Sequence, residues 1–298
     1  MNVSTIDLNF LDRKGDIATY LLPHLGGAVL VDPGPESTLQ AVLSALDMHG
    51  LASSDVTHVL LTHIHLDHAG AAGWFANQGA QVYVHPVGVP HLLNPEKLIA
   101  SASRLYGARM NSLWGDIKSV PADHLVEVQD QAEITVGGLH IRGIHTPGHA
   151  EHHVSYLCED IIFSGDAGGI RFERKRYIRL PFVPPETHLE KWRASLKRML
   201  ATGCERIAPT HFGIFDDANA HLVMAGQFLD EVELWLERTM PGIQDAETLE
   251  VRYADYLQTQ GLAAGLDELA INMYDRGDPI NFAASGLFRY WQKFRSQT

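Results

Sequence analysis

The sequence predicts an α/β protein that ends in a helical extension. Up to about residue 211, short β-branched runs interrupted by Gly and Pro alternate with helical patterns, which is typical of α/β proteins. After Gly213, helix formers and acidic residues replace the β-branched runs. The 298 residues, 45% of them hydrophobic, can bury a large core without disulfides. We therefore expect an α/β domain over residues 1–215 and an α-helical C-terminal extension over residues 216–298.

The individual elements follow from short apolar runs and from apolar stripes at helical spacing. Strands are expected at residues 28–31, 57–61, 81–84, 139–144, 154–157, 161–163 and 206–208. Helices are expected at residues 37–49, 187–201, 217–238, 246–260, 263–274 and 280–295. Residues 86–123 break the strand pattern with a helical stretch around 95–113. We expect this helical insertion to lie over one end of the sheet.

The composition excludes several kinds of protein. A formal net charge of −13 argues against a nucleic-acid binder, whose affinity comes mainly from clustered cations. No segment approaches the roughly 18 consecutive apolar residues of a membrane-spanning helix, and residues 1–9 do not resemble a signal peptide. Cys158 and Cys204 have no CxxC partner and are expected to be buried thiols. The expectation is a cytoplasmic protein without a nucleic-acid or membrane partner.

The central motif is T-H-I-H-L-D-H at residues 62–68, in a chain with 17 histidines. Imidazole nitrogens and carboxylates are the ligands that zinc prefers. If the preceding strand continues to residue 65, the side chains of His63 and His65 point the same way and meet one ion. Asp67 and His68, where the chain turns away, can then bind a second ion. The small residues 69–73 allow a helix to start close to both ions.

Three further polar residues each follow an apolar strand. They are His149 in T-P-G-H, Asp166 in S-G-D and His211 in P-T-H. Loops at strand ends are where α/β proteins build their sites. A single histidine in such a place is more often structural, but four loops of this kind in one chain favour a joint site.

These motifs, together with Asp32 in V-D-P-G-P, resemble the metallo-β-lactamase-fold hydrolases over residues of about 20 to 213. Within that family they resemble the dinuclear branch of the hydroxyacylglutathione hydrolases (glyoxalase II) and acyl-homoserine lactonases. The resemblance implies a four-layer αββα sandwich. It also implies that His63, His65 and His149 bind one metal, that Asp67, His68 and His211 bind a second, and that Asp166 bridges the two.

The resemblance also implies a mechanism. The true β-lactamases of this superfamily lack the bridging aspartate, so Asp166 argues against antibiotic hydrolysis. Two divalent metal ions, zinc or else iron or manganese, would lower the pKa of a bridging water to about 7, so that hydroxide attacks a thioester or a lactone. Asp67 and Asp166 would orient that hydroxide. Asp32 is either a partner that accepts an N–H from a ligand histidine or a plain turn residue.

Three other activities remain open at this point. They are a phosphodiesterase with the same metals, an iron-dependent sulfur dioxygenase, and a non-enzymatic regulator that keeps the fold. The substrate is expected to be a small molecule. Cations in residues 171–179, above all Arg174, Lys175 and Arg176, either attract an anionic substrate or form a solvated loop. His153 is a further candidate for substrate binding. The C-terminal helices either cover the site or form a homodimer surface.

Overall fold

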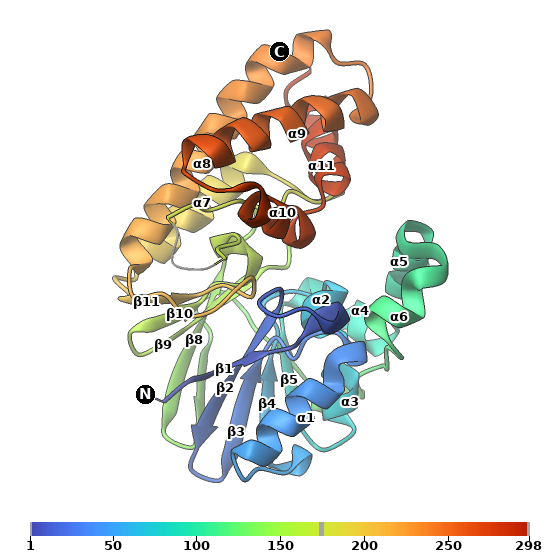
Figure 1. The fold of residues 1–298 in the computed structure, drawn as a ribbon. Coiled ribbons are helices and arrows are strands. Elements are labelled where there is room, and N and C mark those ends of the chain that lie inside the picture. The colour runs from blue at the N-terminus through green and yellow to red at the C-terminus, as the bar shows by residue number, and fades with distance from the viewer. Residues whose placement is uncertain (1, 173–175, 297–298) are drawn as a thin grey trace.

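The structure is a computed structural model that describes residues 2–172 and 176–296. The strands of these residues form two sheets (Figure 1). The six-stranded sheet has the order β1 (Ser4–Asp7), β2 (Ala18–His24), β3 (Gly27–Val31), β4 (Val56–Leu60), β5 (Gln81–Val84), β6 (Leu125–Glu127). The five-stranded sheet has the order β11 (Arg206–Ala208), β10 (Ile161–Phe163), β9 (Val154–Cys158), β8 (Leu139–His145), β7 (Glu133–Val136). All seven expected strands are present.

Parallel pairing brings the important loops to one edge of each sheet. In the first sheet β3, β4, β5 and β6 run parallel, and Val31 pairs with Leu60. In the second sheet β10 and β11 run parallel, and Phe163 pairs with Ala208. Because the carboxyl ends of parallel strands meet at the same edge, the loops after β3 and β4, and those after β10 and β11, leave their sheets side by side.

The sheets pack face to face and carry helices on their outer faces. Tyr20, Tyr156 and Phe163 belong to the core between the sheets. The first sheet packs outward against α1 (Leu39–Met48) and α3 (Ala72–Ala76), and the second against α7 (Leu189–Leu200) and α8 (Ala218–Thr239). Each layer buries one apolar face against the next, which is the main source of stability in such folds. The expected four-layer αββα sandwich is confirmed.

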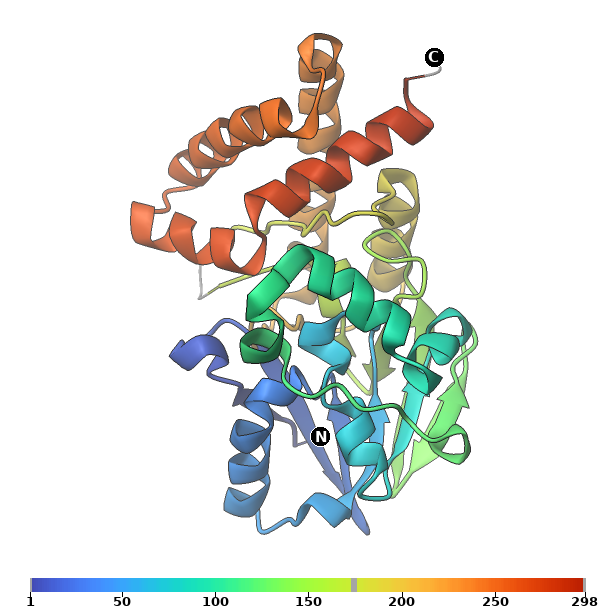
Figure 2. The same ribbon diagram turned by 90° about the vertical axis from the view of Figure 1, so that its right-hand side faces the viewer.

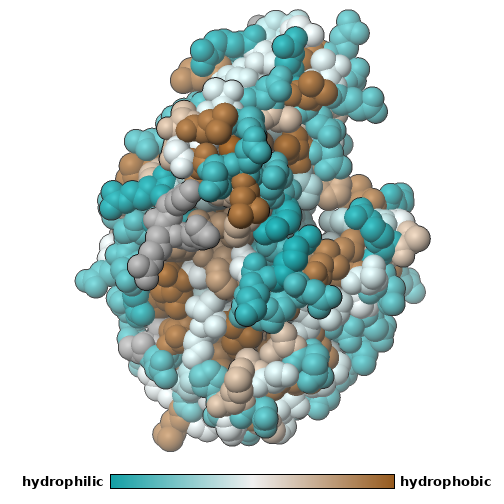
Figure 3. All heavy atoms as spheres, in the orientation of Figure 1, coloured by the Kyte–Doolittle hydropathy of each residue, from teal (hydrophilic) through white to brown (hydrophobic). Residues whose placement is uncertain are grey.

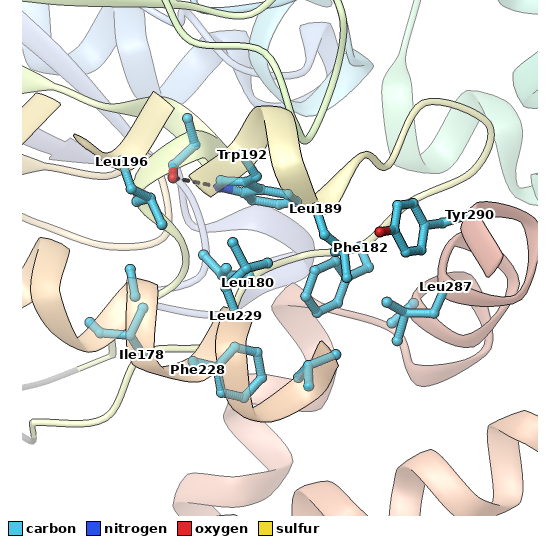
Figure 4. Close-up of a cluster of buried hydrophobic side chains, with 14 of the residues drawn as sticks. Ile178, Leu180, Phe182, Leu189, Trp192, Leu196, Phe228, Leu229, Leu287 and Tyr290 are labelled. Carbon is cyan, nitrogen blue, oxygen red and sulfur yellow. Dashed lines mark hydrogen bonds between the residues drawn. The ribbon is translucent and has the colours of Figure 1, made fainter. Parts of the chain in front are cut away.

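The four expected C-terminal helices are also present: α8, α9 (Ala246–Ala263), α10 (Glu268–Gly277) and α11 (Ile280–Phe294). Helices α8, α9 and α11 share a hydrophobic core with the second sheet and α7, while α10 packs in a separate core with Ile170, Phe172 and Tyr177. Figure 4 shows the core around Trp192, in which Phe182 contacts both Trp192 and Phe228. The Trp192 indole N–H donates to the carbonyl of Ala167 at 2.8 Å. The helical region therefore supports the turn that contains Asp166, although the division at residue 215 itself stays a prediction.

The insertion at residues 86–123 contains α4 (Val89–Leu93), α5 (Glu96–Tyr106) and α6 (Met110–Trp114), which face the viewer in Figure 2. Trp114 stacks on Phe10 with ring centroids 5.6 Å apart, and Tyr106 packs edge-on against both Trp114 and Phe282 of α11. The insertion therefore touches the C-terminal helices through aromatic rings. None of the described helices is both long and apolar enough to cross a lipid bilayer.

Four strands were not expected from the sequence. Strands β1, β6 and β7 lie at the edges of their sheets, where a strand has a partner on one side only and needs no continuous apolar run. Strand β2 lies inside the first sheet, but Pro23 near its end obscures the pattern.

Candidate metal centre

The loop after β4 carries the first two histidines of the motif. His63 and His65 do not continue the strand, because β4 ends at Leu60. The backbone N–H of Thr62 donates to the Asp32 carboxylate at 2.8 Å instead of to a neighbouring strand. The loop still brings the two rings together, with His63 Nε2 2.8 Å from His65 Nδ1. The helix starts slightly earlier than expected, at Leu66 in α2 (Leu66–Ala69).

The first group of side chains is completed by residues that follow the second sheet's strands. His149 follows β8, and Asp166 lies in the 3-10 turn Gly165–Gly168 after β10. His149 Nε2 lies 3.0 Å from His65 Nδ1 and 3.2 Å from Asp166 Oδ2. One potential ligand atom each from His63, His65, His149 and Asp166 lies within 4.8 Å of all the others. Four groups at such distances fit the coordination sphere of one metal ion.

The second group consists of Asp67, His68 and His211. Asp67 Oδ2 lies 3.6 Å from His68 Nε2 and 3.5 Å from His211 Nε2. Asp166 also reaches this group, since its Oδ1 lies 3.4 Å from His68 Nε2 and 3.6 Å from His211 Nε2. The two oxygens of Asp166 therefore face different groups, as a bridging carboxylate would.

Hydrogen bonds from Nδ1 of two histidines leave the lone pair of Nε2 free to bind a metal. His149 Nδ1 donates to the carbonyl of Pro181, and His211 Nδ1 donates to the carbonyl of Asp16, both at 2.8 Å. This fixes the tautomer in which Nε2 can bind a metal. Within the described part of the chain, the buried atoms His68 Nε2 and Asp166 Oδ1 have no hydrogen-bond partner. Because unpartnered buried polar atoms are costly, the residues present fit a bound cation.

The charges of the two groups also suit a cation. Burial, together with His149, lowers the pKa of His65 to about 3, and burial lowers that of His63 as well. Burial alone would lower the pKa of His68, but Asp166 and Asp67 outweigh it and raise the pKa. Burial would raise the pKa of Asp166, yet His68 holds it well below its usual range. His63 and His65 are thus neutral and Asp166 is ionised, as metal ligands must be, whereas His68 would release a proton when a metal binds.

Asp32 connects three of the loops. It is fully buried, and its φ of 50° is a conformation that aspartate tolerates better than most residues. Oδ2 of Asp32 accepts hydrogen bonds from His68 Nδ1 at 2.8 Å, from the Thr62 hydroxyl at 2.7 Å and from the Thr210 hydroxyl at 2.9 Å. The geometry is that of a carboxylate that orients a metal-binding histidine, rather than that of a plain turn residue.

Asp32→Asn is expected to lower metal affinity about 10- to 100-fold while the chain still folds. The amide nitrogen cannot accept a hydrogen bond, so at least one donor from Thr62, His68 or Thr210 loses its acceptor. Metal occupancy against a competing chelator measures the effect, with the exposed Asp47→Asn as a matched control. Equal occupancy in both variants would show that Asp32 does not orient the site.

The two groups lie at the bottom of a cavity of about 860 Å³. Its walls come from the insertion, from residues 275–279, 281 and 282 at the end of α10 and the start of α11, and from the segment before α7. In the space-filling view a hollow separates the C-terminal helices from the α5–α6 segment (Figure 3). Of the two arrangements that the sequence left open for the C-terminal helices, the structure shows that they border the site.

The residues expected to bind substrate are mostly elsewhere. His153 is buried, with Nδ1 2.9 Å from the Thr146 hydroxyl and Nε2 accepting from the Ala167 N–H at 3.3 Å, and it does not line the cavity. His152, its neighbour, does line it. The expectation for His153 is therefore wrong, because both of its nitrogens are engaged inside the fold.

The basic segment at residues 171–179 also differs from the expectation. Arg171 makes two hydrogen bonds to Asp217, and Arg179 makes one to Asp275 at 2.6 Å; both arginines are buried. These two cations anchor C-terminal helices rather than attract a substrate. Arg176 is exposed and does not line the cavity, while Arg174 and Lys175 lie outside the described residues.

Other residues of the cavity wall were missed. Phe10, His91, Asp278 and Phe282 line it, although each is far in sequence from the metal-binding motifs. Phe10 lies in an N-terminal 3-10 turn, and Phe282 lies in the first turn of α11. No local sequence signal marks them, because only the folding of three distant segments brings them together.

The chain is similar to known proteins over most of its length. Its residues 13–211 match the model of the metallo-beta-lactamase superfamily. It is 31% identical to a metallo-beta-lactamase fold-containing protein of Sulfurisphaera tokodaii, over 67% of this chain and 74% of that protein. It is 24% identical to an atrochrysone carboxyl ACP thioesterase of Cryptosporiopsis sp., over 74% of this chain and 60% of that enzyme.

A solved structure shows the same fold. The metallo-beta-lactamase family protein TTHA1429 of Thermus thermophilus superimposes with a TM-score of 0.71 at 21% identity, over 98% of this chain and 93% of that one. The family match covers most of the chain, and within it the histidines and aspartates form two groups that could each hold a metal ion. The chain is therefore a hydrolase of the metallo-beta-lactamase superfamily.

Proposed function

We propose that this protein holds two divalent metal ions and hydrolyses a thioester. The observation that carries the proposal is the position of Asp166, whose two oxygens face two separate groups of ligand side chains at the bottom of one cavity. His63, His65 and His149 would hold one ion, and Asp67, His68 and His211 the other. Zinc fits this set of nitrogen and oxygen donors, with iron or manganese as alternatives. The similarity to a thioesterase favours a thioester over a lactone.

The bound ions would supply an acidified water and would stabilise negative charge on the carbonyl oxygen of the substrate. The residues of the chain have separate tasks. Asp67 and Asp166 are ionised carboxylates that can accept a hydrogen bond from the attacking water and so orient it. The aromatic residues of the insertion line the cavity and would exclude bulk water once a substrate is bound, which would strengthen the electrostatic interactions inside it.

A covalent mechanism through cysteine is disfavoured. Burial raises the pKa of the Cys158 thiol to about 11, and it also raises the pKa of Cys204. Since the thiolate is the nucleophilic form, neither residue is activated at neutral pH. Neither cysteine lines the cavity.

The proposal is tested by metal analysis together with a substrate panel. The full chain, loaded in turn with zinc, iron or manganese, is expected to bind two ions and to have its highest kcat/KM on thioesters. The panel also contains lactones, bis-phosphodiesters and a persulfide with oxygen uptake as readout. A single iron with oxygen uptake would establish a dioxygenase, and preference for phosphodiesters would establish a phosphodiesterase. Two bound ions without any turnover would support a regulator.

A further inference from the structure

The apolar wall of the cavity is built from aromatic rings of three distant segments. Phe10, Tyr106, Trp114 and Phe282 all line it. The rings form a continuous row. The ring centroids are 5.6 Å apart for Phe10 and Trp114, 5.1 Å for Trp114 and Tyr106, and 5.9 Å for Tyr106 and Phe282. Tyr106 and Phe282 are only half-buried, so parts of their rings are available to a ligand. Ring faces and edges of this kind favour contact with another aromatic group.

Three cations at the entrance of the cavity, which we call the α5 rim, lie on α5 and in the turn that follows it. Lys97 and Arg104 lie on the face of α5 that borders the cavity, and Arg109 follows in the next turn. All three are exposed. Within residues 2–172 and 176–296 none of the three forms an ion pair with a carboxylate. Their positive charge is therefore available to a ligand.

Most of the other charged residues of the wall are already compensated. Asp16 pairs with Arg13 at 2.8 Å and with Arg276 at 3.1 Å, and Asp275 pairs with Arg179. Glu186 differs: it accepts a hydrogen bond from the backbone N–H of Glu151, and its neighbour His152, 3.7 Å away, is neutral because burial lowers the pKa of that imidazole to about 2. Asp278 is fully buried, and burial raises its pKa to about 8, so that it is mostly uncharged at neutral pH. Positive charge without a carboxylate partner among the described residues is thus concentrated at the α5 rim of Lys97, Arg104 and Arg109, whereas Glu186 lies on another segment of the wall.

We infer, building on the proposed thioester hydrolysis, that the substrate joins a bulky aromatic acyl group to a phosphate-bearing thiol. The aromatic acyl group contacts Tyr106, Trp114 and Phe282, and the phosphates lie against Lys97, Arg104 and Arg109. The scissile carbonyl lies between them, at the metal-binding groups. A cavity of about 860 Å³ lies in the upper part of the range of roughly 300 to 1,000 Å³ that is usual for ligand pockets, and it is far larger than a small acyl group requires.

The test uses four thioesters that vary the two halves of the substrate independently. The acyl group is 2-naphthoyl or acetyl, and the thiol is coenzyme A or the neutral N-acetylcysteamine. The zinc-loaded full chain is expected to prefer naphthoyl over acetyl by at least about tenfold in kcat/KM on either thiol. It should prefer coenzyme A over N-acetylcysteamine by about tenfold at low ionic strength, and this second preference should shrink as salt is added.

Two variants test recognition of the acyl group and of the thiol separately. Phe282→Leu removes a ring but keeps an apolar side chain, so only the naphthoyl preference should fall. Its control is Phe294→Leu at the other end of α11, outside the cavity. The triple variant Lys97→Gln/Arg104→Gln/Arg109→Gln should lose the coenzyme A preference and its salt dependence. Its charge-matched control replaces three exposed cations outside the cavity by Gln: Lys118, Lys197 and Arg289.

Binding without turnover separates this inference from the proposed function. The thioether S-(2-naphthylmethyl)-coenzyme A has no scissile carbonyl, and its affinity is measured by titration calorimetry for each variant whose thermal unfolding matches that of the wild type. Weaker binding by the cavity variants and not by the controls is expected. Thioester turnover with equal rates for all four substrates would overturn the inference and leave the proposed function intact. Tight thioether binding without thioester turnover would support the inference about the ligand and overturn the proposed function.

Discussion

His65→Ala is expected to lose one of the two metal ions and to reduce kcat/KM by more than about a hundredfold. Loss of a residue that merely supports a ligand already costs 10- to 100-fold, so loss of a ligand should cost more. His65 Nδ1 lies 2.8 Å from His63 Nε2 and 3.0 Å from His149 Nε2, so its removal leaves two imidazoles and one oxygen of Asp166 in that group. The second group does not contain His65 and should keep its ion.

The metal content per chain and the initial rates measure this outcome. His140→Ala is the matched control, because His140 is exposed and lies on β8 outside both groups. A His65→Ala protein with two ions and an unchanged rate would refute the assignment of this side chain as a ligand. Circular dichroism spectra establish whether both variants are folded.

Asp166→Asn should weaken both metal positions together, which distinguishes it from His65→Ala. The carboxylate places one oxygen against each group, and a neutral amide gives up both the negative charge and one of the acceptor atoms. Asp166 and Asp67 are also what raise the pKa of His68 against the effect of burial, so the variant should lower that pKa. We expect a loss of activity of more than about a hundredfold, for the same reason as for His65.

Stepwise removal of metal by a chelator measures both affinities in one experiment. The turn around residue 166 should persist, because the hydrogen bonds that hold it use backbone groups and the Trp192 indole. Asp123→Asn, at an exposed aspartate, is the control. If one affinity falls and the other is unchanged, Asp166 is a ligand of a single ion and not a bridge.

The positions of the candidate ligands could be predicted because their signals are local. Each of them follows a short apolar strand, and the strand–loop pattern at His149, Asp166 and His211 is visible within a few residues. The helices of the C-terminal region were predictable for the same reason, because apolar stripes at helical spacing are local too. Edge strands such as β7 could not be predicted, because a strand with a partner on one side only needs fewer apolar residues.

The walls of the cavity could not be predicted, since they depend on contacts between distant segments. The ring of Tyr106 meets Phe282 only because α5 and α11 fold toward the same edge of the sheets. The run of cations at residues 171–179 was a misleading signal for substrate binding, for a related reason. Arg171 and Arg179 stand in a conspicuous basic run, yet their partners Asp217 and Asp275 are far away in the sequence. Whether a cation is free or paired is a property of the tertiary structure.

The shared core around Trp192 has a consequence for how the protein is made. Leu287 and Tyr290 of α11 belong to the same core as Trp192, whose indole holds the turn next to Asp166. During synthesis on the ribosome, all the metal-binding side chains emerge before α11 does. The nascent chain therefore displays a complete set of histidines and aspartates while the packing that steadies them is still missing. The packing that steadies the turn beside Asp166 is therefore complete only once α11 has been made.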